Sequence, residues 1–367
     1  MTPDLPPMDV RGRASRLRGR FPEVGIDALV VTHLPNIRYL TGFTGSAAVL
    51  VVGSDDLVFV TDGRYQDQAA EQLAATGIEA VVVVRATQAE QRRALMDAVK
   101  PFPRLGLEAH AVTWAQQREW CEAFTTNLLV PTVGEVEALR RVKERGEVER
   151  IRYACGIADD ALGELLPTLS QQPTEREFAL ELEVAMRRRG ATGTSFPTIV
   201  ASGPNGAKPH SRPTERPVER RELVVIDFGC VVDGYCSDMT RTVSVGDPGP
   251  EARHVWDVVL ASQQAGRDAV RAGVTCQAID SASREVIEAA GLGDRFTHST
   301  GHGVGLEIHE APRVARTVGD TVAPGYVVTV EPGVYLPGVG GVRIEDTVVV
   351  TDEGSNPLTA FPKELVV

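Results

Sequence analysis

A β-hairpin is predicted by the stretch Leu223-Val-Val-Ile-Asp-Phe-Gly-Cys-Val-Val-Asp-Gly-Tyr-Cys-Ser-Asp-Met-Thr-Arg-Thr242. Apolar residues precede Asp227, and Asp233-Gly234 is a strong signal for a tight two-residue turn. With these two residues at the centre of the turn, the numbers of opposed residues sum to 467, so Asp238 faces Gly229. Asp227 and Asp238 are then diagonal neighbours on one face, and Gly229, which has no side chain, leaves room between them.

Two carboxylates placed in this way repel each other unless they are protonated or bridged by a cation. A metal site is therefore the first hypothesis for the hairpin. The alternative is that both aspartates lie in polar loops, which is the usual environment of this residue type. The segment alone leaves both possibilities open, so any further ligands must be found elsewhere in the chain.

The composition indicates a water-soluble protein with two domains. At 367 residues and 43% hydrophobic content, the chain is long enough for each domain to bury its own core. The net charge of −12 argues against nucleic-acid binding, which needs a basic surface. No apolar run approaches the ~18 residues of a membrane span, and the N-terminus has no apolar core of a secretory signal. We therefore expect a cytoplasmic protein without nucleic-acid or membrane partners.

The cysteines and tryptophans suggest core positions rather than a redox motif or a binding subsite. The five cysteines are odd in number and form no Cys-x-x-Cys pattern, so we expect buried free thiols in a reducing compartment. Trp114, Trp120 and Trp256 are likewise expected in cores.

Helix-like and strand-like segments alternate through residues 1–133, which we predict to be a small α/β domain. Two of its strands are joined too tightly for a helical crossover, so its sheet should be mixed. Strands are expected at 27–32, 47–52, 57–61 and 79–84, and helices at 11–20, 64–75, 88–99 and 113–124. The alternation stops near 130–134, and a charged helical stretch follows. Residues 134–367 are predicted to form a second, α+β domain, with helices at 135–152, 161–169, 174–189, 252–272 and 276–290 and strands at 194–202, 326–334 and 342–350.

A histidine-rich turn in the second domain offers a nitrogen ligand. The stretch Thr297-His-Ser-Thr-Gly-His-Gly-Val-Gly-Leu-Glu-Ile-His-Glu310 holds three of the seven histidines of the chain. Glycines on both sides of His302 let the backbone bend close to a ligand. A neutral imidazole at this position would suit a transition metal.

Two glutamates are expected to meet across a second hairpin. Val330-Glu-Pro-Gly-Val-Tyr335 and Gly341-Val-Arg-Ile-Glu-Asp346 flank a glycine-rich loop centred on Gly338, and reflection about this residue pairs Glu331 with Glu345. Like charges facing each other on apolar strands are a rare structural device, which favours a functional role.

The assembled set consists of four carboxylates and one imidazole: Asp227, Asp238, His302, Glu331 and Glu345. Four negative charges balance two divalent cations, and the oxygen-rich set suits Mn²⁺ first, with Co²⁺, Zn²⁺ or Fe²⁺ as alternatives. Two such ions ~3.5–4 Å apart lower the pKa of a shared water and polarise a carbonyl, which is hydrolytic chemistry.

The sequence motifs that carry these five residues, in this order, resemble those of the proline-specific branch of the pita-bread metallopeptidases, which comprises the Xaa-Pro dipeptidases (prolidases) and the Xaa-Pro aminopeptidases. The resemblance covers the whole chain. Asn36-Ile-Arg-Tyr-Leu-Thr-Gly-Phe-Thr-Gly-Ser46 and Thr61-Asp-Gly-Arg-Tyr65 are similar to the creatinase-like N-terminal domain of that branch. The resemblance implies a pita-bread catalytic domain, hydrolysis of the Xaa-Pro imide bond and a homodimer.

The resemblance also implies a role for each site residue. Asp227 would chelate one ion, His302 would bind the other, and Asp238 and Glu345 would bridge the two. Glu331 would be both a ligand and the proton shuttle. The remaining implied roles are substrate contact by His210 and His309, binding of the free carboxylate of a dipeptide by Arg313, support of a bridging carboxylate by Arg343, and a packing or supporting role for His298.

Three alternatives remain open at this point. The enzyme would be a dipeptidase if the C-terminus of the substrate is bound, for which Arg313 is the candidate, and an aminopeptidase acting on longer peptides if that side is open. A non-catalytic peptide-binding module and a metal-free hydrolase similar to creatinase also occur on this fold. Both predict missing ligands, whereas all five are present.

Overall fold

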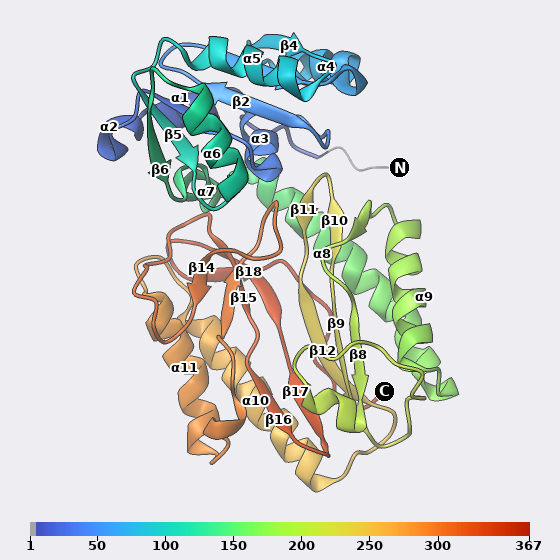
Figure 1. Cartoon of the computed structure of the whole chain (residues 1–367). Coiled ribbons are helices and arrows are strands. Elements are labelled where there is room, and N and C mark those ends of the chain that lie inside the picture. Colours follow the sequence, from blue (N-terminus) through green and yellow to red (C-terminus); the bar gives the residue numbers. More distant parts are fainter. Residues whose placement is uncertain (1–4) are drawn as a thin grey trace. The chain divides into compact units, whose positions relative to one another are not determined.

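The computed structural model describes residues 5–367, which fold into two compact units (Figure 1). One unit comprises residues 8–140, and the other comprises residues 141–367 together with Leu5–Pro7. Both contain helices and strands, as the predicted α/β class requires.

The N-terminal unit is built on a six-stranded mixed sheet with the strand order β4-β3-β2-β1-β5-β6. Strands β1, β2 and β3 pair in antiparallel fashion, whereas β4, β5 and β6 add to its two sides in parallel. The mixed sheet predicted from the short connection between β2 and β3 is therefore confirmed. Helices α5 and α6 cover one face through a buried cluster that includes Leu95, Trp120 and Val30.

The strands of this unit are β1 (Ala28–Val31), β2 (Ala48–Val52), β3 (Leu57–Thr61), β4 (Val81–Val84), β5 (Arg104–Glu108) and β6 (Leu128–Thr132). Its helices are α1 (Arg11–Arg18), α2 (Phe21–Val24), α3 (Leu34–Thr41), α4 (Gln66–Thr76), α5 (Gln88–Val99), α6 (Trp114–Ala123) and α7 (Glu135–Arg140). Strands β5 and β6 and helices α2 and α3 are absent from the sequence-based assignment.

Helix α7 packs with the N-terminal unit, so the division falls after Arg140 rather than after Val133. Glu135 forms an ion pair with Arg20, and the guanidinium of Arg140 donates to the side chain of Asn36. These contacts tie the first turn and the last residue of α7 to elements that precede it by about one hundred residues.

The hairpin that carries Asp227 and Asp238 has the predicted register. Strands β9 (Leu223–Phe228) and β12 (Met239–Ser244) pair Thr240 with Asp227, and the inner strands β10 (Cys230–Val232) and β11 (Tyr235–Cys236) pair Val232 with Tyr235. Asp233 and Gly234 have φ values of 44° and 78°, the left-handed conformation that a tight hairpin turn requires.

The reason for glycine at position 229 differs from the predicted one. A side chain there would meet backbone, because an added Cβ would lie 1.9 Å from the carbonyl oxygen of Ser237. Gly229 therefore allows the close approach of two hairpin segments, rather than leaving room between two carboxylates.

The second predicted register is also observed. Strands β16 (Gly333–Leu336) and β17 (Gly340–Arg343) pair Gly333 with Arg343 around a turn at Gly338, and β15 (Val327–Val330) and β18 (Asp346–Val350) pair Val330 with Asp346. Both ladders follow the same reflection about residue 338. Glu331 and Glu345 lie opposite each other in the interval between them.

The remaining strands of the unit are β7 (Gly193–Thr194), β8 (Ile199–Ser202), β13 (Gly301–Gly303), β14 (Glu310–Val314) and β19 (Ser355–Pro357), and its helices are α8 (Arg145–Leu165), α9 (Glu175–Arg188), α10 (Pro250–Ala269) and α11 (Cys276–Ala289). Helices α8 and α9 pack on the strands around β9, and α10 and α11 pack on the strands around β15 and β17 (Figure 1). Each half of the unit therefore consists of strands that are covered by one pair of helices.

Two of the three tryptophans occupy the predicted core positions. Trp120 and Trp256 are buried, but Trp114 is 77% exposed, so its assignment to a core was wrong. Trp114 is the first residue of α6 and follows the capping residue Thr113, a position whose side chain faces away from the sheet-packed turns of the helix.

No helix within residues 5–367 is long and apolar enough to cross a membrane.

We expect a single thiol to react rapidly in the native protein. All five cysteines are free, but only Cys121 is exposed, and burial raises the pKa of Cys230 and of Cys236 to about 12. Since the thiolate is the reactive form, titration with a chromogenic disulfide at neutral pH should label one thiol per native chain and five in denaturant. Rapid labelling of several thiols in the native protein would contradict this packing.

Candidate active site

A pocket of about 630 Å³ in the C-terminal unit gathers the predicted site residues. It lies among the strand ends and loops that carry the two hairpins and the histidine-rich turn. All ten predicted site residues line it: Asp227, Asp238, His302, Glu331, Glu345, His210, His309, Arg313, Arg343 and His298. Residues that are more than one hundred positions apart in the sequence therefore converge on one space.

The imidazole of His302 lies at the centre of the acidic cluster. Its Nε2 atom is 3.3 Å from Oε1 of Glu331 and 3.6 Å from Oδ2 of Asp238. The other ring nitrogen, Nδ1, is 3.1 Å from the carbonyl oxygen of Gly303, which directs Nε2 towards the carboxylates. Asp238, His302 and Glu345 can each offer one ligand atom within 4.8 Å of the others.

Asp227 is held by a guanidinium at the edge of this cluster. Nη2 of Arg343 donates to Oδ2 of Asp227 at 2.5 Å, and Nη1 donates to the hydroxyl of Tyr335 at 2.7 Å. Arg343 also reaches Glu345, a proposed bridging carboxylate, through Thr240, because its Nε donates to the Thr240 hydroxyl at 3.2 Å and this hydroxyl donates to Glu345. The pairing with Asp227 follows from the fold, because β17 packs beside β9, which carries Asp227.

The carboxylates of the cluster differ in their ease of ionisation. Burial, followed by the neighbouring carboxylates, raises the pKa of Asp238 and of Glu345 well above the usual range. Burial also raises the pKa of Asp227, against the opposing effect of Arg343. Burial would raise the pKa of Glu331 as well, but the hydrogen bond and charge of His302 outweigh it and lower this pKa to about 2.

Three hydroxyl groups that support the cluster were missed from the sequence. Thr240 donates to Oε2 of Glu345 at 2.7 Å, and Thr329 donates to Oε1 of Glu331 at 3.3 Å. The hydroxyl of Tyr335 joins Arg343 to Nε2 of His298, which lies 2.9 Å away. Strand periodicity could have identified Thr240 and Thr329, because each lies two positions from a predicted site residue, Asp238 and Glu331 respectively.

The other two histidines and Arg313 lie on the walls of the pocket. The ring of His309 is 4.4 Å from that of His302 between centroids, and burial with the neighbouring imidazole lowers the pKa of His309. His210 and Arg313 are exposed residues of the lining. Both ring nitrogens of His298 form hydrogen bonds, Nδ1 with the carbonyl oxygen of Ser299 and Nε2 with the hydroxyl of Tyr335. These bonds suit the expected packing or supporting role of this residue.

The chemistry of the cluster fits a divalent metal centre. Five carboxylates line the pocket; Lys143 pairs with Glu310 and Arg343 pairs with Asp227, which leaves Asp238, Glu331 and Glu345 close together around His302. Oε1 of Glu345 is a buried acceptor without a hydrogen-bond partner, so the surrounding residues leave this lone-pair donor unused. Carboxylate oxygens and one imidazole nitrogen are the ligands that divalent first-row metals accept.

The fold and the site together define a class of protein: an α/β protein whose C-terminal unit gathers carboxylates and an imidazole suited to divalent metal ions. Comparison with known families agrees with this class. Residues 149–352 match metallopeptidase family M24, and residues 13–142 match the creatinase/prolidase N-terminal domain.

Similar proteins carry names from the same family. The chain is 33% identical to an Xaa-Pro dipeptidase of Pyrococcus furiosus over 97% of this chain and 100% of that protein. Among solved structures, an Xaa-Pro dipeptidase from Bacillus anthracis is 40% identical with a TM-score of 0.93, covering 98% of this chain and all of that one. An X-Pro aminopeptidase from Thermotoga maritima is 36% identical with a TM-score of 0.86 over 97% of this chain and 100% of that one.

The chain therefore belongs to metallopeptidase family M24 and carries the creatinase/prolidase N-terminal domain. The predicted resemblance to the proline-specific branch of the pita-bread metallopeptidases is confirmed, as is the predicted fold. Membership of this family implies divalent metal ions as cofactors.

Proposed function

We propose that this chain hydrolyses the Xaa-Pro imide bond with two divalent metal ions per subunit and acts as an Xaa-Pro dipeptidase. The observation that carries the proposal is the convergence of all five predicted ligands with His210, His309 and Arg313 in one pocket. The names of the relatives from Pyrococcus furiosus and Bacillus anthracis support the same substrate class. A metal-free binding module on this fold is disfavoured, because it would not retain a buried cluster of four carboxylates at the cost of their mutual repulsion.

The five ligand residues would hold the ions as follows. Asp227 would chelate one ion, His302 would bind the other, Asp238 and Glu345 would be shared between them, and Glu331 would complete the set. When bound, the ions supply a water of lowered pKa and polarise the scissile carbonyl group. Mn²⁺ is the proposed ion, since the set offers one nitrogen among carboxylate oxygens; Co²⁺, Zn²⁺ and Fe²⁺ accept the same ligands.

Glu331 is the proposed proton shuttle. Its carboxylate lies in the pocket with the four other proposed ligands, 3.3 Å from the imidazole of His302, and would accept a proton from the attacking water. The same carboxyl group then delivers the proton to the leaving proline nitrogen. Thr329 restrains the shuttle by its hydrogen bond to Oε1.

His210 and His309 are proposed to contact the substrate. Because its pKa is lowered, His309 is neutral at pH 7 and can donate one hydrogen bond to an oxygen that gains negative charge. An imide bond has no N–H group and a restricted φ, so orientation must come from side chains in this pocket rather than from strand-like backbone pairing.

The two hairpin aspartates should have different effects on metal content. Asp238→Asn is expected to lower the occupancy of both metal positions, because this residue is proposed to bridge the two ions. Asp227→Asn should lower the metal content by only one ion per chain. Elemental analysis after gel filtration in Mn²⁺ would measure the difference, with Asp257→Asn on α10 as a control outside the pocket. Equal losses in the two site variants would contradict the proposed asymmetry.

Substrate length should depend on Arg313. The exposed guanidinium of Arg313 is proposed to bind the free carboxylate of a dipeptide, so Arg313→Ala should raise KM for Ala-Pro by about tenfold or more and change Ala-Pro-Ala little. Arg316→Ala, at an exposed site outside this pocket, is the matched control. A wild-type preference for the tripeptide would favour the second candidate, an Xaa-Pro aminopeptidase, in accord with the name of the Thermotoga maritima relative.

A direct assay tests the function as a whole. The purified chain, supplied with Mn²⁺ or Co²⁺, should hydrolyse Ala-Pro and leave Ala-Ala intact, and a chelator should abolish the activity. Lack of hydrolysis with either ion, despite a folded protein, would reject the enzyme assignment.

We also propose a cytoplasmic homodimer, supported by the free thiols and by the family resemblance.

A further inference from the structure

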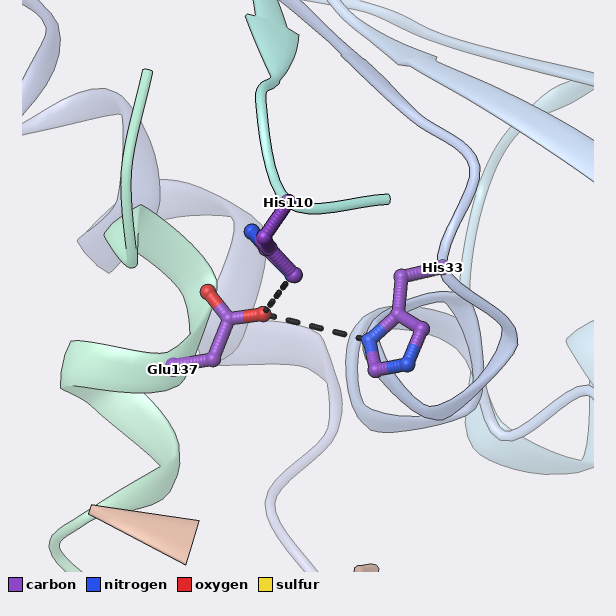
Figure 2. Close-up of side chains that lie close together, drawn as sticks. All are labelled: His33, His110 and Glu137. Atoms are coloured by element: carbon purple, nitrogen blue, oxygen red, sulfur yellow. Dashed lines mark ion pairs between the residues drawn. The ribbon is translucent and has the colours of Figure 1, made fainter. Parts of the chain in front are cut away.

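A second cluster of metal-ligating side chains lies in the N-terminal unit. His33 precedes α3, His110 lies in the turn that follows β5, and Glu137 projects from α7 (Figure 2). Figure 2 shows the carboxylate of Glu137 facing both imidazole rings. The proposed catalytic pocket accounts for none of these three residues.

The distances among the three side chains approach those of a tetrahedral metal site. Oε1 of Glu137 is 3.0 Å from Nε2 of His110 and 3.9 Å from Nδ1 of His33, and the three ligand atoms all lie within 4.8 Å of one another. Ligands at about 2.0–2.1 Å from Zn²⁺ in tetrahedral geometry are separated from each other by roughly 3.3 Å. Small rotations of the half-exposed His110 ring would bring the set to this spacing.

A buried polar network holds these side chains in place. Nδ2 of Asn36 donates to Glu137 at 2.5 Å and to Glu108 at 2.6 Å, and Arg140 donates to Oδ1 of the same asparagine at 2.7 Å. Oε2 of Glu108 accepts from the backbone N–H of His33 at 2.9 Å. Asn36, Glu108 and Arg140 are at most 3% exposed, so the support is rigid.

Glu137 retains unused ligand capacity in this arrangement. Its Oε2 atom is buried and has no hydrogen-bond partner, whereas Oε1 contacts both Asn36 and His110. A buried carboxylate oxygen without a donor is costly unless a cation takes that place. An ion pair between Glu137 and protonated histidines would satisfy Oε1 alone.

We propose that His33, His110 and Glu137 form a mononuclear transition-metal site separate from the dinuclear centre, with Zn²⁺ as the best-suited ion. Two imidazole nitrogens and one carboxylate oxygen are ligands that zinc accepts in four-coordinate sites, and a water molecule would fill the fourth position. By joining the segment before α3, the turn after β5 and helix α7, the ion would stabilise the N-terminal unit. The proposal does not depend on the peptidase assignment, since none of its ligands lines the catalytic pocket.

The test compares zinc content between matched histidine variants of the full-length protein. Each protein is stripped with a chelator, equilibrated with Zn²⁺, separated from free metal and analysed for zinc per chain. His110→Asn should bind one equivalent less than the wild type, and Glu137→Gln should show the same loss. His254→Asn is the control, because this histidine lies exposed on α10 and has no part in either cluster. Circular dichroism establishes that each variant is folded.

Local protection provides a second measurement that does not depend on the total metal count. Zn²⁺ should slow amide hydrogen exchange in residues 32–36, 108–112 and 135–140 of the wild type but not of His110→Asn. Equal zinc content in the wild type and both site variants, without zinc-dependent protection of these segments, would overturn the proposal and leave an ion-pair cluster only.

Discussion

Glu331→Gln is expected to lower kcat for Ala-Pro hydrolysis by about 10²–10⁴-fold, the usual contribution of a positioned general acid–base group. The amide keeps the size of the side chain and one oxygen but cannot carry the proton from water to the leaving nitrogen. The loss should appear in kcat more than in KM, because Glu331 is proposed to act in the transition state. Steady-state kinetics in Mn²⁺ would measure both constants.

A matched variant separates loss of the proton shuttle from loss of the fold. Glu285→Gln makes the same chemical change at an exposed site on α11, within the same unit, and should leave kcat unchanged. Circular dichroism and the melting temperature should be close to wild type in both variants. If Glu331→Gln kept a tenth or more of the wild-type kcat, Glu331 could not be the proton shuttle.

Arg343→Met is expected to destabilise the protein by roughly 3–5 kcal/mol, the usual cost of removing one partner of a buried ion pair. Arg343 is 3% exposed and neutralises Asp227 directly, and its removal would leave this carboxylate beside Asp238 and Glu331 without a cation. The hydroxyl of Tyr335 would also lose a donor. Thermal unfolding of chelated protein would measure the change.

Metal should offset part of this loss. Bound divalent ions neutralise the same carboxylates, so the difference in melting temperature between Arg343→Met and the wild type should be smaller in Mn²⁺ than in chelator. Arg343→Lys, which keeps the charge but cannot donate to Asp227, Tyr335 and Thr240 at the same time, should lie between the two proteins. An unchanged melting temperature for Arg343→Met in chelator would show that the carboxylates need no internal cation.

The two hairpins could be predicted because short turns determine the register of the strands that they join. Asp233-Gly234 placed Asp238 opposite Gly229, and Gly338 placed Glu331 opposite Glu345, as the observed pairing confirms. A register with period two also determines which side chains share a face. The acidic half of the pocket therefore followed from local sequence features.

Other parts of the molecule depend on contacts that local patterns do not contain. Strand β5, Arg104–Glu108, has a charge at each end and a glycine at its centre, so it resembles a loop; its place between β1 and β6 buries it. Helix α3 begins with Leu34-Pro35 and has no side-chain N-cap hydrogen bond, which removes the usual signal for a helix start.

The support of the site was predictable only in part for the same reason. The direct contact between Arg343 and Asp227 could not be predicted, because the two residues are 116 positions apart and only the packing of β17 beside β9 brings them together. The cluster of His33, His110 and Glu137 could not be predicted, since its members come from three separate segments without a motif spacing.

Anomalous diffraction from crystals of the wild-type protein in Mn²⁺, recorded at the manganese absorption edge, tests the proposed dinuclear centre most directly. We expect two peaks in the pocket, both in contact with Asp238 and Glu345, with Asp227 at one peak and His302 at the other. The absence of anomalous density between these four residues, in a crystal whose side chains occupy the positions described here, would contradict it.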